Sequence, residues 1–271
     1  PLVRLTYQKK NTSITFGNLF GNLSHRLVEP LFAFERVMED YQESGLQIKQ
    51  VSERFYVDLW VDWVRRTVRD ATEPENILGG LVSEYTFLKS THFQGDLLLQ
   101  GTIFHVGGQD LAIPAPVSNT MNLATGFRFK WLNQPQAFVK SLRFENYYVA
   151  YLENASDSTR RGNAFYGNLE LDTRWFQLLL SLWISEDYNS IVGGELYRSI
   201  SVSNPGFGER NRNLLFIRLL KDFKIIEDLH INLRVEPYYD FENQLFEYSF
   251  GVYAIYQPQF LLKKFRVRAS D

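Results

Sequence analysis

The feature that most constrains the fold is an alternation of apolar and polar side chains that recurs along the whole chain. In the segment VDLWVDW, the apolar residues Val57, Leu59 and Val61 occupy every second position. Asp58 and Asp62 lie between them. Successive side chains of a β-strand point to opposite faces, so one face of this segment is apolar and the other carries two carboxylates. The pattern fits a half-buried sheet in water, and it fits a barrel in lipid whose apolar face points outward.

About thirteen segments follow this period of two. The clearest are residues 3–8, 46–49, 55–63, 93–103, 122–131, 165–172, 229–236 and 246–256, and less regular ones are 79–90, 141–153, 176–186 and 212–223. Helical periodicity is confined to residues 31–41, which predict one short helix. No run approaches the ~20 apolar residues of a membrane helix, so a chain of this kind crosses a membrane only as strands.

The connections between the segments alternate in length. Short ones fall near 9–12, 51–54, 89–91, 133–140, 173–175 and 224–228, and long polar ones at 25–44, 70–79, 106–121, 154–162 and 187–211. Bacterial outer-membrane barrels have short periplasmic turns and long outer loops, whereas a soluble sandwich has no reason for this order. The sequence therefore predicts an all-β fold: an antiparallel transmembrane β-barrel of about 14 strands (12–14), in a single domain that spans residues 1–271.

Thirteen strands are an odd number, while a barrel with both termini in the periplasm needs an even one. Three explanations stay open: an upstream N-terminal strand absent from this chain, a fourteenth strand at 259–268, or one segment divided wrongly. We favour the first, because Pro1 begins almost inside a strand.

Rings near the strand ends predict an aromatic girdle at the membrane interfaces. The chain has 22 Phe, 15 Tyr and 5 Trp, and amphipathic rings prefer the headgroup level. The alternative is that these rings are ordinary core residues. The predicted girdle consists of Phe55, Trp63, Trp131, Trp175, Phe176 and Tyr256.

Charged side chains on the polar face of the strands are predicted to line the lumen, because facing lipid they would be costly. The predicted lumen residues are Asp58, Asp62, Asp96, Arg128, Lys130, Glu170, Asp172, Arg174, Arg234 and Glu236. In this interpretation the carboxylates of Asp58 and Asp62 are satisfied by water or by Arg and Lys side chains of neighbouring strands, such as Arg128, Lys130 and Arg234.

Composition and motifs exclude several classes of function. A formal net charge of −2 gives no reason to expect nucleic acid as a partner, and the absence of cysteine excludes disulfides and thiolate chemistry. The histidines are scattered, at His25, His92, His105 and His230, so no catalytic triad, metal site or cofactor is predicted. The acidic loop at 25–44 can bind Ca²⁺, but a solvated face is favoured. Two predicted loops are basic, and anionic lipopolysaccharide or partner loops are their candidate ligands; their cations are Arg160, Arg161, Arg210 and Arg212.

The segment SITFGNLFGNLSHRLVEPLFAFERVMEDYQESGLQIK at 13–49 and GGELYRS at 193–199, together with the strand-rich remainder, resemble uncharacterised outer-membrane β-barrel proteins of Bacteroidota. The resemblance implies a location in the cell outer membrane and no particular activity. Outer-membrane phospholipase A has a barrel of similar length, but its motif sets a His shortly before a Ser. The nearest analogue here, NASDSTRRGN at 154–163, has Ser156 and Ser158 and no nearby His.

The sequence favours two hypotheses about function. The first is a porin-like passive channel for small polar solutes through a lumen of mixed charge, since about fourteen strands enclose more space than eight. The second is a non-transporting barrel that anchors a larger surface complex, with outer-membrane proteins or lipoproteins bound through its long loops. An outer-membrane hydrolase is a third reading. The expected partners are membrane lipid and lipopolysaccharide, and the favoured interpretation is that the chain is not an enzyme.

Overall fold

The computed structural model describes residues 3–36, 42–66, 73–107, 116–134, 136–155, 158–201, 206, 208–226 and 228–256. Thirteen strands in these residues form one antiparallel sheet in which each strand pairs with the next along the chain. The strands are β1 (Arg4–Lys9), β2 (Thr12–Asn18), β3 (Ser44–Val51), β4 (Phe55–Arg65), β5 (Glu75–Lys89), β6 (Phe93–Gly107), β7 (Ser118–Leu132), β8 (Val139–Ala155), β9 (Ser158–Thr173), β10 (Gln177–Glu186), β11 (Asn211–Ile226), β12 (Leu229–Asp240) and β13 (Leu245–Tyr256). The predicted all-β antiparallel fold of 12–14 strands is confirmed.

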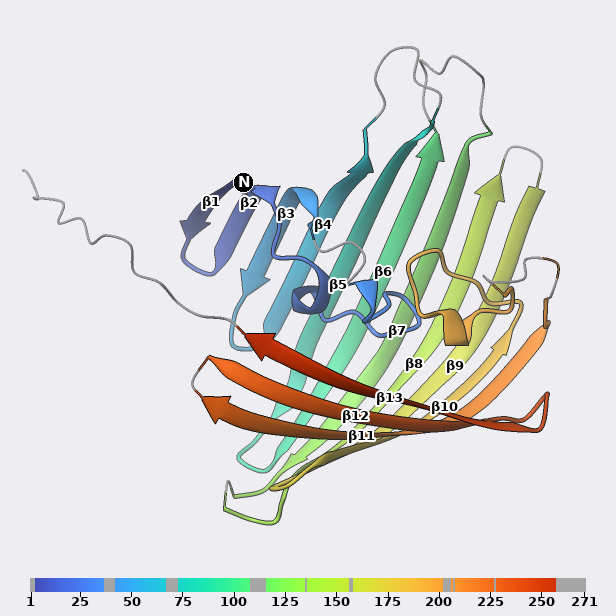
Figure 1. Ribbon diagram of the computed structural model, residues 1–271. Helices are drawn as coiled ribbons and strands as arrows, with labels where there is room; N and C mark the ends of the chain where they lie inside the picture. The colour runs from blue at the N-terminus through green and yellow to red at the C-terminus, as the bar shows by residue number, and fades with distance from the viewer. Residues whose placement is uncertain are drawn as a thin grey trace, which may run out of the picture.

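The sheet curls so that β11–β13 pass in front of the central strands (Figure 1). Among the described residues β1 and β13 are the two ends of the sheet and do not pair with each other. In an antiparallel meander the first and thirteenth strands run in the same direction, so one further strand between them would restore the antiparallel pattern. The proposed strand at 259–268 lies outside the described residues, and the missing upstream strand stays a prediction.

The connections confirm the predicted order of short and long, with one exception. The segment 154–162 is not a long loop: β8 and β9 continue through it, and Asn154 pairs with Thr159 and Ala155 with Ser158. Only residues 156 and 157 separate the two strands. Arg160 and Arg161 therefore lie in a strand and not in a basic loop. We call the two rims of the sheet the short-turn end and the long-loop end.

Burial alternates along the strands as the sequence predicts. In β4, Tyr56, Asp58, Trp60 and Asp62 are buried, whereas Leu59 between them is 46% exposed. The outward positions of neighbouring strands are also apolar and exposed; they include Leu97, Leu123, Phe144, Leu169, Ile184 and Val235. A continuous apolar surface of this extent is far larger than soluble monomers carry.

Two connections from the long-loop end fold into the curl: a first inner segment, residues 19–36, and a second, residues 187–201 (Figure 1). The first contains the 3₁₀ helix η1 (Asn22–His25) and the second contains η2 (Glu195–Tyr197). The helix predicted for 31–41 is wrong for residues 31–35, which form turns; residues 37–41 lie outside the described residues.

The two inner segments bind each other through their backbones. The Ala33 amide donates to the Val192 carbonyl at 2.8 Å, and the Gly194 amide donates to the Glu29 carbonyl at 2.9 Å. A Cβ atom at Gly193 would lie 1.9 Å from the Pro30 carbonyl oxygen, so only glycine permits this approach.

Aromatic side chains of the inner segments and the strands form the main core inside the curl. Tyr188 and Tyr197 of the second inner segment pack on Trp183 of β10, with ring centroids 4.9 and 5.1 Å apart. Leu31 of the first inner segment joins the same buried cluster. The interior of the curl is therefore built as a packed core around the two inner segments.

Candidate functional site

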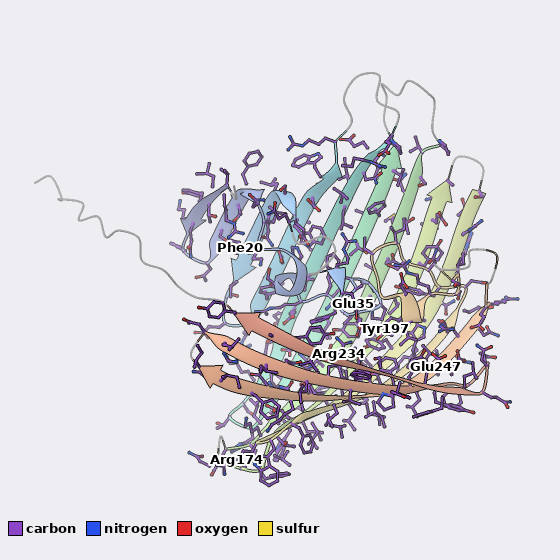
Figure 2. All side chains as sticks on the ribbon, viewed as in Figure 1. Phe20, Glu35, Arg174, Tyr197, Arg234 and Glu247 are labelled. Carbon is purple, nitrogen blue, oxygen red and sulfur yellow. The ribbon has the colours of Figure 1, made fainter. Side chains whose placement is uncertain are left out.

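The predicted lumen residues lie mainly on the buried side of the strands. Asp58, Asp62, Asp96 and Arg234 are at most 6% exposed. The intermediate ones are Arg128, Lys130, Glu170, Asp172 and Glu236, and Arg174 is exposed at the short-turn end (Figure 2). Within the described part of the chain, Lys130, Asp172 and Arg174 form no ion pair. Whether these side chains line a water-filled lumen stays a prediction.

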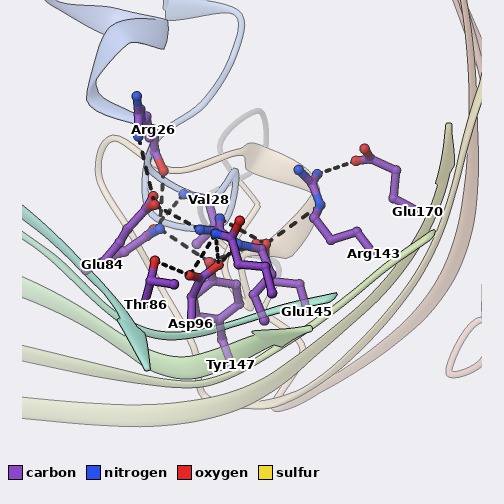
Figure 3. Close-up of polar contacts among 12 residues, drawn as sticks. Arg26, Val28, Glu84, Thr86, Asp96, Arg143, Glu145, Tyr147 and Glu170 are labelled. Carbon is purple, nitrogen blue, oxygen red and sulfur yellow. Dashed lines mark hydrogen bonds and ion pairs between the residues drawn. The ribbon is translucent and has the colours of Figure 1, made fainter. Parts of the chain in front are cut away.

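Arg128 organises one group of inward charges. Its guanidinium lies 2.8 Å from a Glu84 oxygen, 2.9 Å from an Asp96 oxygen and 3.5 Å from a Glu145 oxygen. Arg143 extends the group from Glu145, at 3.8 Å, to Glu170 (Figure 3). These carboxylates come from four strands, β5, β6, β8 and β9, so the group fastens the wall of the curl together.

A second group attaches the first inner segment to the wall. The Glu29 carboxylate contacts Arg218 of β11, lies 3.3 Å from Arg234 of β12 and accepts a 3.3 Å hydrogen bond from the Tyr197 hydroxyl. Glu236 pairs with both arginines. Tyr197 and Arg234 lie inside the curl (Figure 2). The groups around Arg128 and Glu29 border a cavity of about 590 Å³, and the Glu29 group also borders one of about 570 Å³.

His25 forms a third group with two carboxylates. Its Nε2 lies 2.6 Å from a Glu43 oxygen, and its Nδ1 lies 2.9 Å from an Asp58 oxygen. The ring stacks on Trp60 with centroids 4.1 Å apart, and Lys49 approaches Asp58 to 3.5 Å. The prediction that a lysine of a neighbouring strand pairs with Asp58 is confirmed by Lys49 of β3. The three cations named as examples, Arg128, Lys130 and Arg234, are not its partners, and His25 was not foreseen.

Burial lowers the pKa of His25, but hydrogen bonds to Asp58 and Glu43 outweigh it, and the net result is a raised pKa. The ring is fully buried, and both of its nitrogens are engaged by carboxylates. The ring therefore has no free nitrogen with which to accept a proton from a substrate. The hydroxyl of the neighbouring Ser24 lies 3.4 Å from the Lys49 ammonium and not beside the ring nitrogens. The His25 group is thus a structural ion cluster. The solvated face predicted for the acidic loop is wrong for Glu29 and Glu43 and is confirmed for Glu35, which is exposed. Glu39 and Asp40 lie outside the described residues.

The other candidate group lies on the outward side of the sheet near the long-loop end. The Nδ1 atom of His105, in β6, lies 2.8 Å from the Oδ1 atom of Asn119, its cross-strand neighbour in β7. Phe104, the preceding residue, packs on the buried cluster around Trp60, so alternation directs His105 outward. The amide oxygen only accepts hydrogen bonds, so Nδ1 carries the proton and Nε2 presents its lone pair.

Glycine makes room for this ring. A Cβ atom at Gly107 would lie 2.9 Å from His105 Nε2 and 3.4 Å from a side-chain carbon of Val117, which is itself exposed. The free nitrogen therefore lies over bare backbone at the rim of the sheet, and no described side chain hydrogen-bonds to it. A half-buried imidazole with one oriented and one free nitrogen has the arrangement of a general base.

The His105 pair continues as a polar row across four strands. Asn119 is paired with Asn154 of β8, and Asn154 with Thr159 of β9, whose hydroxyl donates to Asn154 Oδ1 at 3.1 Å. The next outward-facing positions toward the short-turn end are Ile103, which is 41% exposed, and Met121, which is 44% exposed. The outward positions at Ile103 and Met121 are therefore apolar, and the next ones toward the long-loop end, His105 and Asn119, are polar.

The remaining histidines are differently placed. His92 is in the turn before β6 and bonds the Leu132 carbonyl at 3.2 Å, at the short-turn end. His230 is 3.2 Å from Asp222, beside another short turn. The pairing of His105 with Asn119 was not predicted, because the two residues are 14 apart in the sequence. An available signal was that both fall at outward positions of adjacent strands.

The predicted girdle residues lie near the strand ends. Phe55, Trp131, Trp175 and Tyr256 are between 37% and 62% exposed, and Trp63 and Phe176 are half-buried. Their contact with a membrane interface stays a prediction. Across the described ranges, no set of three or more His, Asp or Glu residues is placed to hold a metal ion, and no helix has the length and apolar character to cross a membrane.

A family model described as Lipid A 3'-O-deacylase-type matches residues 1–265. No curated protein and no solved structure matches the chain. The family is described by a hydrolytic activity, which overturns two predictions: that the chain is a porin-like channel or an anchoring scaffold, and that it is not an enzyme. The third reading, a hydrolase, fits this family. Inside the curl, the two inner segments and the buried aromatic cluster occupy part of the space that the channel prediction assigned to solutes.

Proposed function

Because the chain belongs to the lipid A 3'-O-deacylase-type family, we propose that it is an outer-membrane hydrolase that removes an ester-linked acyl chain from lipid A. The apolar outward surface and the order of short and long connections support a barrel in the outer membrane, with the long-loop end outside. The protein would then bind lipid A from within the membrane, at the level where the acyl esters are attached to the sugar.

The observation that carries the choice of site is the His105–Asn119 pair. Of the four histidines in the described part of the chain, His105 alone combines an outward position at the long-loop end with a ring nitrogen that no described side chain hydrogen-bonds. His25 is sealed inside, and His92 and His230 belong to the opposite rim. A membrane lipid reaches His105 without leaving the bilayer, whereas the His25 group would require it to enter the packed core.

The chemistry follows from the tautomer that Asn119 holds. Nε2 of His105 takes a proton from water, and the water oxygen attacks the carbonyl carbon of the ester. The tetrahedral intermediate collapses with cleavage of the bond between the carbonyl carbon and the sugar oxygen. The proton on Nε2 passes to that oxygen, so the products are a fatty acid and a free sugar hydroxyl. Asn119 is a positioning residue, because it orients the ring and does not touch the substrate.

Mass spectrometry of lipid A tests this proposal. The protein is produced in the outer membrane of a Gram-negative host, and lipid A is expected to lose one ester-linked acyl chain. H105A is expected to lower the rate by roughly 10²–10⁴-fold, the usual contribution of a general base. H92A is the matched control, since it removes an imidazole from the opposite rim, and its rate should equal that of the wild type.

Heat-modifiable migration on gel electrophoresis verifies that each variant is folded. Unchanged lipid A in cells that contain the folded wild-type protein would contradict the proposed activity. Full activity of folded H105A would leave the activity standing and contradict the site.

A further inference from the structure

Arg161 is a cation on the same outward side of the sheet as the proposed site. It lies in β9 between Thr159 and Asn163, and Phe165 on the same side of the strand is 42% exposed. Ala164 and Tyr166 on the other side are buried. Arg161 pairs across β8 with Leu152, which pairs with Met121 of β7. The backbone of Arg161 therefore lies one outward position closer to the short-turn end than the polar row of His105 and Asn119.

Arg161 has no carboxylate partner in the described part of the chain. Other arginines at the long-loop end do: Arg65 pairs with Glu73, Arg210 lies 2.5 Å from Glu186, and Arg212 lies 2.8 Å from Glu209. An arginine on the outside of a barrel is costly unless it reaches the interface and meets an anion there. Lipid phosphate is the anion at that level, and the planar guanidinium binds phosphate in bidentate geometry.

The separation from His105 indicates how broad the headgroup is. Arg161 is on β9 and His105 on β6, three strand spacings away, which places their backbones roughly 14 Å apart across the sheet. A ligand that touches both must present its phosphate and its ester at well-separated points, as a phosphorylated disaccharide does and a single glycerophospholipid headgroup does not.

We propose that Arg161 binds a phosphate of a phosphorylated disaccharide lipid and so places its acyl ester at His105. This inference rests on the proposed function for the identity of the lipid, and it makes Arg161 the residue that selects phosphorylated over dephosphorylated substrate. The polar row between Asn119 and Thr159 lies along the path from one contact to the other.

Binding in the absence of turnover tests the inference. The H105A protein, in detergent micelles, is titrated with diphosphorylated lipid A, with chemically dephosphorylated lipid A and with phosphatidylglycerol. The expected result is a preference for the diphosphorylated form, and H105A/R161A should lose roughly tenfold in affinity for it, equivalent to about 1.4 kcal/mol. Affinity for dephosphorylated lipid A should be unchanged, and H105A/R161K should lie between the two.

Arg160 provides the matched control. It precedes Arg161 but takes the opposite face of β9, the face of the buried Ala164 and Tyr166, so H105A/R160A should bind as H105A does. Equal losses in the two double variants, or equal losses for phosphatidylglycerol and lipid A, would overturn the inference in favour of general attraction to anionic lipid. These outcomes are independent of hydrolysis. A protein that shows the Arg161-dependent preference but does not deacylate lipid A would contradict the proposed function alone.

Discussion

The Nδ1 atom of His105 lies 2.8 Å from the Oδ1 atom of Asn119 on the outward side of two neighbouring strands. This contact fixes which ring nitrogen holds a proton, because an amide oxygen is only an acceptor. It also places the other ring nitrogen on the outward side of the sheet, beside the backbone of Gly107 near the long-loop end.

Substitution of Asn119 should show whether this residue orients the His105 ring, which affects kcat, or binds the substrate, which affects KM. N119A is expected to lower kcat for lipid A about 10- to 100-fold with little change in KM, because the ring loses its preferred tautomer. N119D should retain orientation, but its negative charge favours the imidazolium, so the acidic limb of the kcat profile should move to higher pH. An N119D profile that coincides with that of the wild type would argue against His105 as the base.

The His25 cluster should make stability depend on pH. The pKa of His25 in the folded protein is raised above its ordinary value of 6.5. Its contribution is therefore fully present below pH 6.5 and is lost as the pH rises through the folded value. The facing groups are Glu43, Asp58 and Lys49, so loss of the imidazolium charge leaves two buried carboxylates with one lysine.

Thermal unfolding in detergent, followed by heat-modifiable migration, measures this effect. Tm of the wild-type protein should fall on passing from about pH 6 into the alkaline range, and the H25Q variant should show a flatter curve. Parallel curves for the two proteins would mean that His25 does not carry a stabilising charge.

Planar-bilayer recordings should detect no regular conductance steps from the wild-type protein. The two inner segments build a packed core inside the curl, with Trp183, Tyr188 and Tyr197 each at most 2% exposed. A porin in the same bilayer is the positive control. Reproducible single-channel steps from the purified protein would contradict this arrangement of the interior.

Gly126 should be more sensitive to alanine than Gly101. A Cβ atom at Gly126, in β7, would lie 1.9 Å from the Asn146 carbonyl oxygen of β8. At Gly101, in β6, the nearest heavy atom would be 3.4 Å away. G126A must displace the β8 backbone and should lower Tm by several degrees, whereas G101A should be close to neutral. Equal Tm values for the two variants would contradict this prediction, because they would mean that displacing the β8 backbone does not destabilise the protein.

Much of the wall of this protein was predictable from sequence because strand alternation is a local property. The faces of Asp58 and Leu59 follow from their adjacency, and so does the outward position of His105. The predicted loop at 154–162 failed because NASDSTRRGN has the polar composition of a loop. Cross-strand pairs such as Asn154 with Thr159 continue the hairpin through it, and such pairs are not visible in composition.

The sequence by itself determined most of the strands and the face that each of their side chains takes, since a period of two leaves little freedom in either. Only the tertiary structure decided that two long connections fold inward, that Glu29 meets Arg218 across 189 residues, and that His25 neutralises Asp58. Those contacts depend on loop paths and on strand register, which no local pattern encodes. For the same reason the sequence does not show which charges are partners. The tertiary structure alone distinguishes the buried ion cluster of His25 from the outward imidazole of His105.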